Sequence, residues 1–111
     1  MYAWIITEDN LYHPEHSISD EAGKSGPRGA DATLINGLGD PMSDIYRKAY
    51  EFRMYDDDGI LYYTGRLAVK GLKTEDPGEY VLMAPLYDFA GPSAGATLIK
   101  YTNHPEWDIE Y

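Results

Sequence analysis

The stretch that decides the fold spans residues 49–69 and reads AYEFRMYDDDGILYYTGRLAV. Asp58-Gly59 is a favoured pair for a tight two-residue turn, because both central positions of such a turn need positive φ. That turn would place Tyr55 opposite Tyr62 and Glu51 opposite Arg66. The stretch therefore predicts an antiparallel hairpin.

The two faces of this hairpin differ in polarity. The side chains on one face are apolar or aromatic, namely Tyr50, Phe52, Met54, Leu61, Tyr63 and Leu67. The other face carries charged, hydroxyl and tyrosine side chains, namely Glu51, Arg53, Tyr55, Tyr62, Thr64 and Arg66. A shift of one residue would mix the faces, so the pattern favours the two-residue turn over a three-residue loop.

The rest of the chain predicts short elements around the hairpin. Aromatic, β-branched and alternating patterns predict strands at residues 2–7, 80–84 and 97–102. Capping residues predict one helix from Asp31 to about Asn36 and another that begins at Pro41 or Ser43 and ends at Lys48. Loops or turns are expected at residues 10–29, 70–78 and 88–95. The tail, residues 103–111, is expected to lie on the body through Trp107 and Ile109.

These elements predict an α+β fold within one compact domain, residues 1–111. Its antiparallel sheet would have about four strands around the 49–69 hairpin, with one or two short helices on one face. A chain of 111 residues has room for one modest core.

Composition excludes several classes of protein. The chain has no cysteine, which rules out disulfides and thiol catalysis. Its net charge of −10 opposes direct binding to nucleic acid or to anionic membranes. No apolar run is long enough to span a membrane, and the N-terminal residues lack the pattern of a secretion signal. We therefore expect a cytoplasmic protein.

Charge is spread unevenly along the chain. Residues 1–23 contain five carboxylates and no Lys or Arg. The middle segment, residues 47–73, has a small excess of basic residues, and from residue 74 onward seven acids face only Lys100. One surface could therefore be much more negative than another.

No motif for catalysis or metal binding is complete. Asp56-Asp57-Asp58-Gly59 has the wrong spacing for a calcium loop, which leaves a solvated hairpin tip. The three histidines are His13, His16 and His104. Two of them lie close to Glu15, but no helix would align them, so we expect a solvated loop and no metal or cofactor. The chain also lacks a nucleophile elbow, and we expect no enzymatic activity.

Two glycine-containing motifs suggest phosphate contacts. Gly23-Lys24-Ser25 resembles the end of a phosphate-binding loop, although Ile18 stands where that loop needs its first glycine. Gly26-Pro27-Arg28-Gly29 presents one arginine that could hold a phosphate or a carboxylate. A plain loop with a surface arginine is the alternative.

Four stretches carry a resemblance to known sequences: 26–30, 52–59, 61–65, and 85–89 before Gly95. They read GPRGA, FRMYDDDG, LYYTG and PLYDF, and in this order they resemble small uncharacterised proteins of actinobacteria and their mobile elements. The resemblance implies one compact domain and a phage or plasmid setting. It implies no activity, cofactor or site residue.

The leading functional hypothesis is a small acidic inhibitor, such as an anti-CRISPR or other anti-defence factor, that occupies the basic groove of a nucleic-acid-binding machine. On an extended strand, alternate carboxylates lie about 6.6 Å apart, close to the spacing of backbone phosphates. The candidate surface consists of Asp56, Asp57, Asp58, Glu75, Asp76 and Glu79.

Two other hypotheses remain. Eleven tyrosines favour a protein interface, with Tyr55 and Tyr62 as the best candidates for a sheet face that binds a protein or a second copy in a homodimer. The same pair could instead shield the sheet. The remaining hypothesis is a small hydrolase or transferase with a carboxylate or histidine site.

Overall fold

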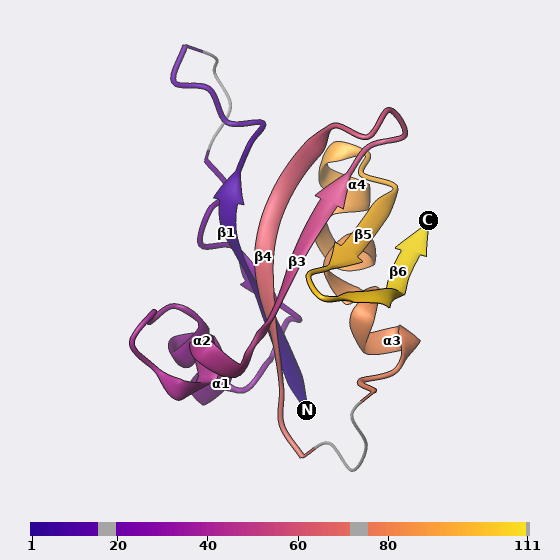
Figure 1. The fold of residues 1–111 in the computed structure, drawn as a ribbon. Helices are drawn as coiled ribbons and strands as arrows, with labels where there is room; N and C mark the ends of the chain where they lie inside the picture. The colour runs from indigo at the N-terminus through magenta and orange to yellow at the C-terminus, as the bar shows by residue number, and fades with distance from the viewer. Residues whose placement is uncertain (16–19, 72–75, 111) are drawn as a thin grey trace.

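A computed structural model describes residues 1–15, 20–71 and 76–110. Its centre is a six-stranded antiparallel sheet with the order β2-β1-β4-β3-β5-β6 (Figure 1). The strands are β1 (Tyr2–Asp9), β2 (Ser25–Gly26), β3 (Tyr50–Tyr55), β4 (Leu61–Val69), β5 (Leu98–Tyr101) and β6 (His104–Glu110). The α+β class is therefore confirmed, and the predicted sheet of about four strands roughly matches the six observed. The prediction of one or two short helices on one face was wrong, because helices pack on both faces of the sheet.

The β3–β4 hairpin has the predicted register up to its last pair. Glu51 faces Arg66 and Met54 faces Tyr63, as expected, but the register then shifts and Tyr55 faces Leu61. The prediction that Tyr55 pairs with Tyr62 was therefore wrong. The two faces of the hairpin keep the predicted apolar and polar side chains up to Met54, because the shift lies at the hairpin end.

The turn itself differs from the predicted two-residue type. It is a three-residue loop in which Asp56 N–H donates to the Ile60 carbonyl at 3.1 Å and only Gly59 has positive φ, at 78°. The Asp56 carboxylate accepts from the backbone N–H groups of Asp58, at 2.9 Å, and Ile60, at 2.8 Å. These side-chain bonds stabilise the longer loop, which is a common hairpin connection.

A helical layer covers the apolar face of the sheet. It consists of α3 (Glu79–Leu82), the π-helical turn η1 (Leu86–Ala90) and α4 (Gly91–Ala94). The predicted strand at 80–84 and connection at 88–95 were wrong. Leu82, Leu86 and Phe89 are spaced as on one face of a helix, and all three are buried in the main core with Phe52 and Ile99.

Two further helices pack on the opposite face, at one end of the sheet. They are α1 (Ala32–Leu38), capped by Asp31, and α2 (Asp44–Lys48), capped by Ser43, which confirms both helices. Buried side chains of a second, smaller core lie beneath them, namely Ala3, Leu34, Leu38 and Ala68. No helix in the described residues is both long and apolar enough to cross a membrane.

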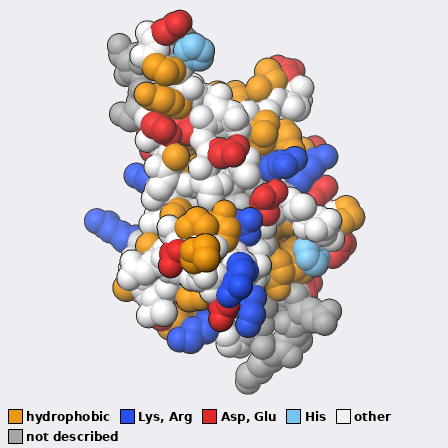
Figure 2. All heavy atoms as spheres, turned by 60° about the vertical axis from the view of Figure 1, so that its left-hand side comes forward, with side chains coloured by type: hydrophobic (Ala, Val, Ile, Leu, Met, Phe, Trp, Pro, Cys, Tyr) orange, Lys and Arg blue, Asp and Glu red, His pale blue; other side chains and the backbone are white. Residues whose placement is uncertain are grey.

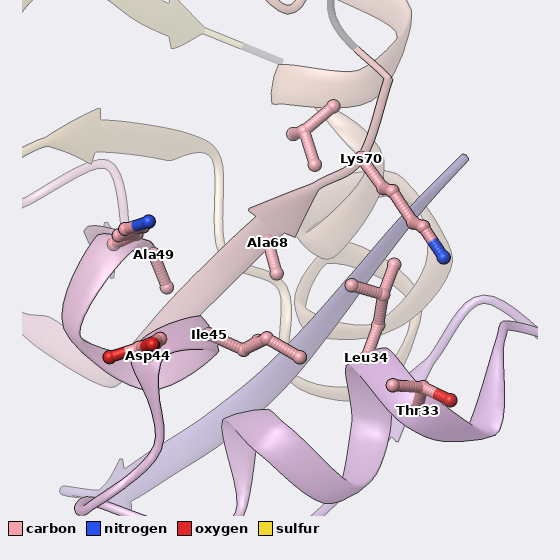
Figure 3. A pocket seen from close by; sticks show the side chains of 9 residues that line it. Thr33, Leu34, Asp44, Ile45, Ala49, Ala68 and Lys70 are labelled. Atoms are coloured by element: carbon pink, nitrogen blue, oxygen red, sulfur yellow. The ribbon is translucent and has the colours of Figure 1, made fainter.

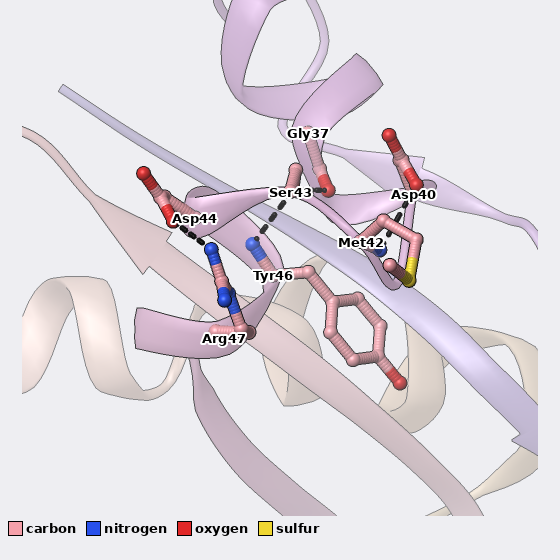
Figure 4. A network of polar contacts seen from close by, with 7 residues as sticks. All are labelled: Gly37, Asp40, Met42, Ser43, Asp44, Tyr46 and Arg47. Carbon is pink, nitrogen blue, oxygen red and sulfur yellow. Dashed lines mark hydrogen bonds and ion pairs between the residues drawn. The ribbon is translucent and has the colours of Figure 1, made fainter.

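Polar contacts fix the corner between α1 and α2 (Figure 4). The Ser43 hydroxyl donates to the Gly37 carbonyl at 2.6 Å and accepts from Tyr46 N–H at 3.0 Å. Arg47 forms an ion pair with Asp44 one turn earlier. Ser43 thus caps the first turn of α2 and also bonds to α1, so it holds the two helices together at this corner.

The C-terminal tail forms the edge strand β6 instead of an irregular cover. It pairs with β5 and buries Trp107, as the sequence indicated, while Ile109 is half-buried. The strand expected at residues 97–102 is confirmed as β5, although β6 follows it in the chain. Short β2, which the sequence did not predict, pairs with β1 through Trp4–Gly26 and Ile5–Ser25.

The buried hydroxyl of Tyr101 predicts a pH-dependent stability. It donates to the Leu82 carbonyl at 2.7 Å and joins the sheet to the helical layer. Burial raises the pKa of Tyr101 above its ordinary value near 10. Above about pH 10 the unfolded chain loses this proton while the folded protein keeps it, so the contribution to folding stability falls as pH rises.

We therefore expect Tyr101→Phe to lower the free energy of unfolding by about 1 to 2 kcal/mol at pH 7, because the Leu82 carbonyl loses its donor. The difference from wild type should shrink between about pH 10 and pH 12, since phenylalanine has no proton to lose. Urea unfolding measured at several pH values checks both expectations. A difference that stays constant up to pH 12 would contradict the assignment.

Candidate functional site

Strand pairing brings two distant acidic segments to the same end of the molecule. Asp9 of β1 faces Tyr63 of β4, and Asn10 N–H donates to the Tyr62 carbonyl at 2.9 Å. The loop after β1 therefore leaves the sheet at the end where the β3–β4 turn lies, and both are at the top of Figure 1.

We call this surface the acidic end. It carries eight carboxylates: Glu8, Asp9, Glu15, Asp20, Glu21, Asp56, Asp57 and Asp58. Neither of the two segments that form it, residues 1–23 and 54–65, contains Lys or Arg. Figure 2 shows red carboxylates at the upper end of the molecule, whereas the blue basic side chains lie lower.

Some of these carboxylates hold the local backbone. Asp9 accepts from the N–H groups of Leu11, at 2.9 Å, and Glu21, at 3.0 Å, and so ties the two ends of the loop together. Asp56 holds the hairpin turn, as described above. Glu8, Glu15, Asp20, Asp57 and Asp58 are exposed. Glu15 lies beside His13 and Asp20 accepts from Ala22 N–H, so Glu8, Asp57 and Asp58 are the carboxylates best placed to face another molecule.

Two tyrosines of β4, Tyr62 and Tyr63, lie beside carboxylates of the acidic end. Burial, together with the smaller contribution of the Asp9 and Glu21 charges, raises the pKa of Tyr63 to about 12. Burial also raises the pKa of Tyr62, with a contribution from the neighbouring Asp56. Nearby carboxylates contribute to both pKa shifts, because their negative charge disfavours the ionised form of a tyrosine. These contributions agree with the excess of acidic residues at the acidic end.

The two tyrosines predicted as an interface pair have separate surroundings. Tyr62 contacts Tyr63 edge to face, with ring centroids 6.5 Å apart. Tyr55 lies instead beside β5, with the Lys100 ammonium 5.9 Å from its ring centroid. Exposed aromatic and apolar surface at the acidic end comes from Ile60, which is 56% exposed, and Tyr12, which is 37% exposed.

The remaining predicted acids lie elsewhere. Figure 1 shows α3 toward the opposite end of the sheet from the β3–β4 turn. There Asp76 and Glu79 line a groove of about 260 Å³ beside Trp107, together with Glu106 and Asp108. Glu75 lies outside the described residues. The described acids of the predicted surface thus lie in two places: Asp56, Asp57 and Asp58 at the acidic end, and Asp76 and Glu79 beside Trp107.

The expectation that these carboxylates lie along an extended strand, at the spacing of phosphates, was wrong. Asp57 and Asp58 belong to the turn, and Asp56 lies just beyond the end of β3. Their carboxylates are therefore not spaced as alternate residues of a strand. Sequence analysis missed the contribution of Glu8, Asp9, Asp20 and Glu21, although the lack of Lys and Arg in residues 1–23 was the signal for it.

The described histidines have local partners. His13 lies 3.9 Å from Glu15, and His104 lies 3.1 Å from Glu106 and stacks on Trp107 at 3.8 Å. His16 lies outside the described residues. Within residues 1–15, 20–71 and 76–110, no three His, Asp or Glu side chains are arranged to hold a metal ion.

A cavity of about 280 Å³ lies between α1, α2 and β4 (Figure 3). Leu34, Ile45 and Ala68 form its apolar wall, with Asp44 and Lys70 also lining it. Leu34 and Ala68 belong to the smaller core, and Ile45 packs against it. The cavity has no carboxylate in common with the acidic end.

A search of protein-family models, of curated proteins and of solved structures found no match to this chain.

Proposed function

We propose that the protein binds a basic surface on a partner protein through its acidic end. The observation that carries this proposal is the concentration of eight carboxylates at one end, formed by two segments without Lys or Arg. A surface of one charge sign steers a partner of the opposite sign toward it and disfavours other partners.

The partner we propose is a protein with a groove that normally holds nucleic-acid phosphates. Such a groove presents Lys and Arg side chains, which form charge-assisted hydrogen bonds with carboxylates as well as with phosphates. Occupation of the groove by Asp57, Asp58 and their neighbours would inhibit nucleic-acid binding by that partner. The protein would thus act as an inhibitor in competition with nucleic acid.

Exposed apolar groups at the acidic end support a specific contact. Ile60 and Tyr12 offer surface that loses water on binding, close to the carboxylates. Long-range charge would set the association rate, while these contacts would slow dissociation. Salt should therefore weaken the complex strongly, because the Debye length is only about 8 Å at physiological ionic strength.

A labelled oligolysine peptide tests the charge requirement directly. We expect it to bind the wild type, with an affinity that falls about tenfold or more between about 50 mM and 300 mM salt. The triple variant Glu8→Gln, Asp57→Asn, Asp58→Asn should bind about fivefold or more weakly at low salt. Fluorescence anisotropy measures both effects.

The matched control removes three carboxylates from the groove beside Trp107, with Glu79→Gln, Glu106→Gln and Asp108→Asn. Both triple variants change the net charge from −10 to −7, so a difference between them reports position and not total charge. Equal weakening by the two variants would overturn the proposal that the acidic end is the binding surface.

A further inference from the structure

A groove of about 510 Å³ lies at the β2 edge of the sheet, where β1 and β2 meet the helical layer. Its polar lining residues are Tyr2, Lys24, Ser25, Arg28, Tyr80, Asp88 and Ser93. Two consecutive motifs that suggested phosphate contacts in the sequence, Gly23-Lys24-Ser25 and Gly26-Pro27-Arg28-Gly29, contribute residues 24–28 to its lining.

Gly26 allows a large side chain to form part of this groove. It pairs with Trp4, and a Cβ atom at Gly26 would lie only 2.5 Å from Trp4 Cζ2. No side chain larger than hydrogen therefore fits without a shift of the indole. Glycine at this position lets the indole lie across β2 and line the groove.

Trp4 carries an unsatisfied hydrogen-bond donor. The residue is 2% exposed, and its Nε1–H group is buried with no hydrogen-bond partner in the described part of the chain. A buried donor without an acceptor costs about 1 to 3 kcal/mol, so folded proteins seldom retain one. Trp4 lines the groove, so an oxygen atom bound there, or one water molecule between them, would satisfy this donor after a small shift of β2 or the indole that exposes it.

The charges around the groove favour an anion with a second, hydrogen-bonding part. Lys24 and Arg28 are both exposed and supply two positive charges. Asp88 is the one carboxylate that lines the groove among the described residues. Tyr80 is 77% exposed and offers a ring against which a small molecule can pack.

We propose that this groove binds a small phosphate monoester that carries hydroxyl groups, such as a sugar phosphate. A phosphate monoester has a charge of about −1.5 to −2 at pH 7, which matches the two cations better than a carboxylate does. Asp88 would accept hydrogen bonds from the hydroxyl groups. This inference concerns a separate surface and does not depend on the acidic end.

Three probes distinguish the parts of the ligand: ribose 5-phosphate, inorganic phosphate and ribose. We expect ribose 5-phosphate to bind with a Kd of about 1 mM or tighter, phosphate about tenfold more weakly, and ribose not measurably. In ¹⁵N–¹H NMR spectra the Trp4 indole signal should shift with saturation, while the Trp107 indole signal stays fixed. The Trp107→Phe variant assigns the two signals.

Variants test the role of each charge. Lys24→Gln with Arg28→Gln should abolish the shift, whereas Arg53→Gln with Lys100→Gln, which removes the same charge elsewhere, should leave it unchanged. Asp88→Asn should weaken ribose 5-phosphate but strengthen inorganic phosphate, because the neutral amide accepts hydrogen bonds from hydroxyl groups more weakly than a carboxylate does and no longer repels the phosphate. No saturable shift up to about 10 mM ribose 5-phosphate, or equal binding by the two double variants, would overturn the proposal.

Discussion

Replacement of Gly65 by alanine is expected to lower the free energy of unfolding by about 3 kcal/mol. Gly65 lies in β4 between β1 and β3, and it faces Phe52 across the hairpin. An alanine Cβ would lie 2.4 Å from the Ile5 carbonyl oxygen and 2.4 Å from Phe52 Cζ. The carbonyl belongs to the neighbouring strand, so relief of this contact requires movement of the sheet backbone.

Gly39→Ala is the matched control for this substitution. Gly39 has φ of −83°, which suits alanine, and its added Cβ would lie 3.7 Å from the nearest atoms. We expect its free energy of unfolding to stay within about 1 kcal/mol of wild type. Chemical denaturation of both variants provides the comparison. Similar stabilities for the two alanine variants would show that the close approach at Gly65 does not constrain the sheet.

The contact between Gly65 and Phe52 could be predicted from the sequence, because the alternation of polar and apolar residues fixed the hairpin register. The loop type could not. The register shift at Tyr55 depends on two hydrogen bonds to the Asp56 carboxylate, and an Asp before Asp-Gly is compatible with either loop. Local patterns therefore determined the strands but not the exact turn.

Helical spacing was missed in residues 79–94. Val81 and its neighbours form a short apolar run that fits a buried strand or a helix equally well, and Pro85 and Pro92 suggested interruptions. Packing against the sheet decides the outcome, because Leu82, Leu86 and Phe89 reach the core together only when this segment is helical.

The acidic end could be predicted only in part. Composition shows that residues 1–23 and 54–65 lack Lys and Arg, but their proximity depends on the pairing of β1 with β4. This pairing joins residues more than fifty positions apart, and no local pattern specifies it. The same limit applies to the groove at β2, where Asp88 comes from a distant helical segment.

Trp107→Ala is expected to lower the free energy of unfolding by about 4 kcal/mol. Trp107 is 7% exposed and anchors the edge strand β6. Its ring stacks on His104 at 3.8 Å and meets Tyr50 edge to face at 5.0 Å. Tyr80→Ala is the control, because Tyr80 is 77% exposed and its loss should cost about 0.5 kcal/mol or less.

Loss of Trp107 is also expected to change the association state. β6 pairs with β5 and carries exposed Glu106, Asp108 and Glu110, whose charges oppose the addition of a second copy at this edge. If β6 detaches, the backbone groups of β5 become available for pairing with another chain. Sedimentation velocity should then show concentration-dependent dimers for Trp107→Ala and monomers for wild type and Tyr80→Ala. Dimers of the wild type at the same concentrations would show that the acidic edge does not prevent self-association, and would favour a homodimer.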